Sequence, residues 1–323
     1  MGGLDAMEYT LSAFERVGGT VAGAFWMVTR EGYEKAAAWQ EKWGAVVKPN
    51  DPMLYGRDWY VDANARKIGL RTYDPYNYMI REWAPTQTHN LSVNGKDGKT
   101  DYNLSFGYLD QSGINKPAKI DDFKRYNGSV RVGTNVSDKL RVYTGAMFSK
   151  RDKRYAYATN STTADPWLYL YRWGPTYPMT TEDGDPVRSP ASEMAAANTA
   201  FQEYNYMSLN GGLIFSPLKD WNINFDYTHA NQEYITKRPG TRFTARDSWS
   251  APVIKNDQWN TINLYTTYDM NINEVHKLKY MLGINRVGYK NAYNWSQTTQ
   301  LIDYTNPQFD LATGTMTTSG GEY

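Results

Sequence analysis

The sequence contains no cysteine among its 323 residues, which excludes a disulfide scaffold and any metal site built on thiolates. Its charges nearly cancel, with 34 acidic residues against 35 Lys and Arg, so no overall charge favours binding to nucleic acid. No apolar run approaches the roughly 18 residues of a membrane-spanning helix. Helical membrane proteins and disulfide-rich secreted domains are therefore excluded.

Aromatic residues are abundant, at 15% of the chain with 27 Tyr and 11 Trp. These two side chains combine an apolar ring with a polar tip, which suits a boundary between an apolar layer and water. The mean hydropathy of -0.69 is compatible with a membrane β-barrel, because barrel strands place apolar residues only at every second position. A tyrosine-rich secreted β-protein would have the same composition, so both classes stay open.

A period of two is clearest between residues 88 and 110. Bulky residues alternate with small polar ones in two neighbouring stretches, and the bulky set is His89, Leu91, Val93, Tyr102, Leu104, Phe106 and Tyr108. Residues 96–99 between the stretches are polar and include Gly98, which can adopt a positive φ. The two stretches are predicted to form a β-hairpin with one apolar face.

The same alternation returns in three further pairs of stretches. Their predicted turns lie at 137–139, 216–220 and 273–274. Connections within each pair are short, whereas those between pairs are long, at 111–123, 152–203 and 231–257. Strict alternation of tight turns and long loops is typical of outer-membrane barrels and unusual in compact sandwiches. The predicted fold is all-β, an antiparallel up-and-down meander forming part of a transmembrane β-barrel with long external loops.

Residues 1–87 are predicted to form an early barrel strand, a helix and a loop excursion, and 88–323 to form a partial barrel of about eight strands in hairpins. The amino-terminal region has a mixed stretch with an apolar strand candidate at 21–28, and then an excursion rich in Tyr, Pro and Asp from 49 to 87. Between them, Arg30 to Trp43 is dense in good helix formers, with Thr29 placed to cap and Gly44 placed to end a helix. A further helical turn is expected around 76–83.

Several strings resemble the SusC/RagA family of TonB-dependent outer-membrane transporters. They are REWAPTQTHNLSVNG at 81–95, YNLSFGYLDQSGI at 102–114 and FKRYNGSVRV at 123–132, with looser likeness to about residue 286, including ATNSTTADPWLYLYRWGP at 158–175. The helix at 30–43 and the pair Asp58-Trp59 also look like this family. Asn94-Gly95 departs from it by replacing an expected Gly pair.

The resemblance implies import of oligosaccharides or peptides through the outer membrane of Bacteroidetes-like cells. It implies a SusD-like surface lipoprotein as partner, outer-membrane lipid around the barrel, and energy from a TonB complex acting on a plug domain. A signal peptide, a plug and further carboxy-terminal strands are not visible, so the chain is expected to be an internal fragment of a longer protein. No cofactor is implied.

The substrate-contact candidates lie in the long loop at 158–175, where aromatic rings recur beside hydrogen-bonding groups. They are Asn160, Asp165, Trp167, Tyr169, Tyr171, Arg172 and Trp173. The same rings would also serve to pack long loops together, and the sequence leaves that open. The candidates for aromatic girdles at the membrane boundaries are Tyr102, Tyr108, Trp221 and Tyr227, on the apolar strand parity near strand ends.

No catalytic or metal site is predicted, and the protein is expected not to be an enzyme. The string GKDGKT at 95–100 lacks the first glycine of a phosphate-binding loop, because position 93 is Val93. The three histidines have no partner at metal-ligand spacing, and 182–185 is better explained as a polar turn than as a calcium site. Asp226 and Asp269 could serve as the acid/base pair of a glycosidase only if they were held at a fixed separation. The preferred interpretation is that they are solvated carboxylates facing the inside of a barrel.

The main alternative is a secreted or surface-exposed β-sandwich that binds carbohydrate without catalysis. The two hypotheses differ in where the apolar strand parity lies: exposed on a barrel, buried between two sheets in a sandwich. The discriminating residues are Leu104, Phe106, Val130, Val132, Ile223 and Phe225.

Overall fold

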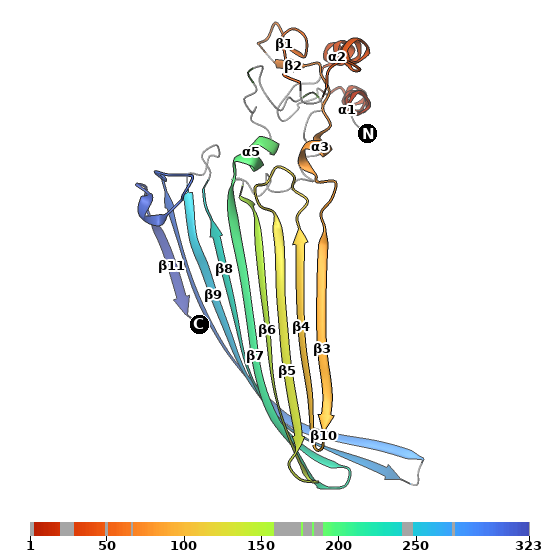
Figure 1. Cartoon of the computed structure of the whole chain (residues 1–323), viewed down its shortest axis with the longest axis vertical. Coiled ribbons are helices and arrows are strands. Elements are labelled where there is room, and N and C mark those ends of the chain that lie inside the picture. Colours follow the sequence, from red (N-terminus) through yellow and green to blue (C-terminus); the bar gives the residue numbers. More distant parts are fainter. Residues whose placement is uncertain are drawn as a thin grey trace.

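One antiparallel sheet of nine strands dominates the computed structural model (Figure 1). The structure describes residues 3–19, 29–48, 51–65, 67–157, 176, 183, 190–240, 248–272 and 275–322. Each strand pairs with its neighbours in the chain, in the order β11-β10-β9-β8-β7-β6-β5-β4-β3. The up-and-down meander predicted from the sequence is therefore confirmed. The sheet is not closed, because β3 and β11 do not pair with each other.

The four predicted hairpins are all present, and each joins two long strands. The strands are β3 (Thr86–Asp97), β4 (Thr100–Ser112), β5 (Asp122–Asn135), β6 (Leu140–Tyr157), β7 (Asn198–Leu218), β8 (Trp221–Arg238), β9 (Ser248–Ile272), β10 (His276–Thr299) and β11 (Thr317–Glu322). Gly98 has φ +56° in the first turn, where a side chain would be strained. The third turn is tighter than predicted, because β7 continues to Leu218.

Tight turns and long connections lie at opposite ends of the sheet (Figure 1). We call the end with the turns at 98–99, 136–139 and 219–220 the turn end, and the opposite end the loop end. The helices and the amino-terminal region all lie beyond the loop end (Figure 1). No helix among the described residues is long and apolar enough to cross a membrane.

The described part of the amino-terminal region contains α1 (Leu4–Arg16), α2 (Arg30–Trp43), β1 (Trp59–Val61), β2 (Lys67–Gly69) and α3 (Pro75–Met79). The helix predicted at 30–43 is confirmed, and Thr29 Oγ1 accepts a 3.0 Å hydrogen bond from the Gly32 backbone as its cap. Helix α1 was not predicted; it forms because Met7 and Leu11, one turn apart, pack against Ala36 of α2. The strand candidate at 21–28 lies outside the described residues.

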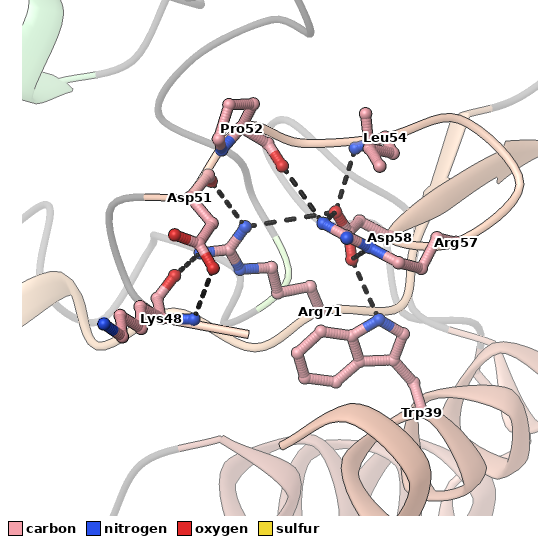
Figure 2. A network of polar contacts seen from close by, with 8 residues as sticks. All are labelled: Trp39, Lys48, Asp51, Pro52, Leu54, Arg57, Asp58 and Arg71. Atoms are coloured by element: carbon pink, nitrogen blue, oxygen red, sulfur yellow. Dashed lines mark hydrogen bonds and ion pairs between the residues drawn. The ribbon is translucent and has the colours of Figure 1, made fainter. Parts of the chain in front are cut away.

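A buried carboxylate holds the amino-terminal region together (Figure 2). Asp58 is 1% exposed and accepts hydrogen bonds from Trp39 Nε1 at 2.9 Å and from Arg57 Nη2 at 2.7 Å. The guanidinium of Arg71, 3.9 Å from Asp58 Oδ2, donates to the backbone carbonyls of Lys48 at 2.5 Å and Asp51 at 2.8 Å. Asp58, just before β1, thus connects Trp39 of α2 with Arg71 in the segment after β2.

The region is attached to the loop end by apolar packing and backbone hydrogen bonds. Met79 and Ile80 pack against Ala191 and Met194 of α5 (Pro190–Ala196), which precedes β7. The Met79 carbonyl also accepts a 2.9 Å bond from the Lys116 backbone, in the connection between β4 and β5. The amino-terminal region therefore covers part of the loop end.

Acidification should loosen the contact between α1 and α2. Arg30 of α2 lies 2.5 Å from Glu8 and 2.6 Å from Glu15 of α1, and its hydrogen bonds hold the pKa of Glu15 below the ordinary value. A lowered carboxyl pKa gives stability that is complete above the unfolded pKa and is lost as pH falls through the folded one. We expect α1 amide protons to exchange more readily below about pH 4, relative to those of the sheet. In the Arg30→Gln variant, the exchange of α1 amide protons should depend much less on pH. If the same pH dependence remained, groups other than this ion pair would be its cause.

Candidate functional site

The predicted substrate-contact residues all fall in 158–175, outside the described residues, so their role stays a prediction. Thr176, next in the chain, is 2% exposed. It lies so close to Gly69 of β2 that a Cβ built there would come within 2.3 Å of the Thr176 carbonyl oxygen. Thr176 is thus packed against the amino-terminal region.

One face of the sheet is apolar and exposed; we call it the apolar face. It runs across the strands in register, through Leu91, Leu104, Phe106, Val130, Phe148, Leu209, Phe225, Leu264 and Ile284, together with the residues two positions away in each strand. Leu104 is 46% exposed, Phe106 47% and Leu264 42%, whereas Val132 and Ile223 are partly exposed. No second sheet among the described residues covers this face. The two-layer sandwich alternative is therefore wrong.

Aromatic residues lie toward both ends of the apolar face. Tyr108 packs against Tyr126 with ring centroids 5.1 Å apart on the loop-end side. At the turn end, Trp221 is the register partner of Tyr268, and its Nε1 donates a 2.7 Å hydrogen bond to Thr266 Oγ1. Tyr102 lies two residues into β4 from the turn end, whereas Tyr227 lies well inside β8 instead of near its end. Tyr102 and Tyr108 are six residues apart, about 20 Å along the strand.

Toward the loop end, beginning in the row of Tyr108 and Tyr126, the apolar face also carries charged residues, and three of its cations have acidic partners. Lys124 lies 3.6 Å from Asp110, and Lys150 lies 2.8 Å from Glu203. Arg154 makes a two-point ion pair with Asp122, with Nε 2.9 Å from Oδ1. The loop-end part of this face thus combines aromatic rings with ion pairs, a mixture that suits a boundary between an apolar layer and water.

The opposite face, which we call the polar face, carries a different chemistry. One register row in its loop-end half crosses six strands and consists of Arg125, Arg151, Tyr204, Tyr234, Lys255 and Tyr293. The Arg151 guanidinium lies 4.9 Å from the Tyr204 ring centroid, a cation–π distance. Sequence reasoning missed this row, because its members are far apart in the chain and only the strand register brings them together.

The carboxylates of the polar face do not form a catalytic pair. Asp226 accepts a short hydrogen bond from the Tyr143 hydroxyl, and Asp269 lies 3.8 Å from Lys279. Asp226 pairs with Asn263, so Asp269 lies six residues further along β9, about 20 Å away. Carboxylates of a glycosidase lie within about 10 Å of each other. The glycosidase interpretation of these two residues is therefore wrong.

The histidines of the sheet have polar and aromatic neighbours. His89 stacks on Tyr108 with ring centroids 6.2 Å apart, and His229 Nδ1 lies 2.9 Å from Asn260 Oδ1. No group of three or more His, Asp or Glu side chains in the described part of the chain is arranged to hold a metal ion.

No family model and no curated protein matches the chain. Solved structures do match. The RagAB peptide transporter superposes with a TM-score of 0.62 at 15% identity, and the RagAB peptide importer in its open-open state with a TM-score of 0.62 at 16% identity. Both alignments cover 100% of this chain and 36% of the other, so the chain spans little more than a third of these neighbours. The fold described above is thus shared with a part of the RagAB transporter.

Proposed function

We propose that this chain forms part of the barrel wall of an outer-membrane nutrient transporter of the SusC/RagA type. The exposed apolar face carries the proposal. A surface of this extent in water would expose far more apolar area than soluble proteins tolerate, whereas in a bilayer it would contact lipid. The open edges at β3 and β11 would pair with other barrel strands, because unpaired backbone groups are costly in hydrocarbon.

The remaining parts of the proposal concern orientation and partners. Tight turns face the periplasm and long loops the exterior in outer-membrane barrels, which places the amino-terminal region outside the cell. A SusD-like lipoprotein would then cap the loop end, and a TonB complex would supply energy through a plug domain. Substrates would be oligosaccharides or peptides passing along the polar face. In this proposal the chain has no catalytic role and needs no cofactor.

Lipid contact can be tested at two adjacent residues of β4 that lie on opposite faces. This chain has no cysteine, so Phe106→Cys and Ser105→Cys each provide one labelling site within it. In protein expressed from its complete reading frame and reconstituted into lipid vesicles, we expect a fluorophore at 106 to be quenched mainly by spin-labelled lipid. A fluorophore at 105 should be quenched mainly by iodide in the water. Equal responses at both positions would contradict a lipid-facing apolar surface.

A further inference from the structure

Two arginines face each other on the polar face without a counter-charge. Arg125 of β5 and Arg151 of β6 are direct register partners. Like charges in this position destabilise a sheet unless something neutralises them. The Nε atom of Arg125 is buried and has no hydrogen-bond partner, and neither arginine has an ion pair within the described part of the chain. Among the described residues, no anion neutralises this pair.

Carboxylates are present near the two arginines, as the adjacent residues in the same strands show. Lys124 and Lys150, one position away and on the apolar face, each have an acidic partner, in Asp110 and Glu203. Asp257, a carboxylate of the polar face two residues from Lys255 in β9, already accepts hydrogen bonds from Tyr289 Oη at 2.7 Å and from the Asn291 side-chain amide. At this level of β5 and β6, the lysines of the apolar face are therefore paired and the arginines of the polar face are not, although the two sets lie one residue apart.

Other members of the row extend the cationic surface. Lys255 also has no ion pair with a described residue, and it is separated from Arg151 by Tyr204 and Tyr234. Three strand spacings place Lys255 about 14 Å from Arg151. In the next row, Lys153 lies 5.2 Å from the Tyr155 ring centroid. The row offers guanidinium, ammonium and phenol donors, with phenol oxygens as its side-chain acceptors.

We propose that this row binds the carboxylates of an acidic peptide as it passes along the transporter wall. The proposal rests on the proposed function and names the class of substrate. Guanidinium groups bind carboxylates in a two-point geometry, and tyrosine rings hold Arg side chains in place. In an extended peptide, residues i and i+4 are about 13 Å apart, which matches the distance from the arginine pair to Lys255. A neutral glycan fits less well, because its hydroxyls need acceptors as well as donors.

The test compares two double variants with the same loss of charge in the same two strands. Arg125→Gln with Arg151→Gln removes the unpaired cations of the polar face, and Lys124→Gln with Lys150→Gln removes paired cations of the apolar face. Both would be made in protein expressed from its complete reading frame and purified in detergent. The probe is a Gly/Ser peptide with Glu at positions 2 and 6, and its partner has Gln at both positions.

For the unmodified protein we expect the Glu peptide to bind at least about tenfold more tightly than the Gln peptide, with affinity falling as salt rises. The arginine variant should lose this preference, and the lysine variant should keep it within about twofold. Equal binding of both peptides, equal loss in both variants, or stronger binding of an oligouronate than of the peptide would overturn the inference. Because binding is measured without transport, a negative result beside a lipid-quenched label at 106 would reject the acidic peptide and leave the membrane proposal standing.

Discussion

Replacing Asp58 with alanine is expected to destabilise the amino-terminal region by about 3–5 kcal/mol, because it leaves a buried guanidinium without its counter-charge. Arg71 is 2% exposed and cannot reach water without opening the region. The loss also removes the acceptor for Trp39 Nε1 on α2 and for the Leu54 backbone amide, which donates at 2.9 Å. Arg57 also donates a hydrogen bond to Asp58, and this bond raises the pKa of Arg57. The substitution therefore removes a stabilising partner from a second cation.

The expected unfolding is local, which allows an internal comparison. Hydrogen exchange should accelerate in α2 and β2 and stay unchanged in strands β5 to β8, which make none of the contacts of Asp58. Glu41→Ala is the matched control, because Glu41 is an exposed carboxylate on α2, and its effect should stay within about 0.5 kcal/mol. Protection of α2 that is the same in both variants would show that the network is not needed for this packing.

The strands were predictable because their signal is local. A residue such as Leu104 differs from Ser105 in the sequence itself, and eight long strands repeat that contrast. Strand β11 has the sequence TTSGGE, which has no apolar parity, and its place depends on pairing with β10. The eight strands from β3 to β10 were therefore predictable from the sequence, whereas β11 was not.

The polar networks could not be predicted, because they depend on distant segments. Asp58 collects donors from Trp39 and Arg57, and Arg71 joins from beyond β2. The row of the polar face is similar: Arg125 and Lys255 are in one line only through the registers of the intervening strands. A signal was available in the strand parity, because Arg125 and Arg151 both fall on the polar parity, but parity gives no register between strands. Local pattern determines which face a side chain occupies, and tertiary register determines its partners.

Arginine at position 104 should weaken membrane insertion, whereas arginine at position 105 should not. Leu104 is 46% exposed on the apolar face, between the aromatic positions Tyr102 and Tyr108, where lipid tails would surround it. A cation on a lipid-facing strand near the bilayer centre costs about 2–4 kcal/mol. Leu264→Arg, on β9 and the same face, should add a similar cost, because the two sites are separated by intervening strands and share no partner.

The measurement is reversible unfolding by guanidinium chloride in lipid vesicles, on protein expressed from its complete reading frame. We expect the double variant Leu104→Arg with Leu264→Arg to lose roughly 4–8 kcal/mol. Ser105→Arg adds the same charge one residue away, where the side chain meets water on the polar face, so its loss should stay below about 1 kcal/mol. A cost at 105 equal to that at 104 would mean that the apolar face does not contact lipid. The difference in cost between the two faces is the decisive result. A sheet that arginine destabilises for reasons other than lipid contact would show similar costs at positions 104 and 105.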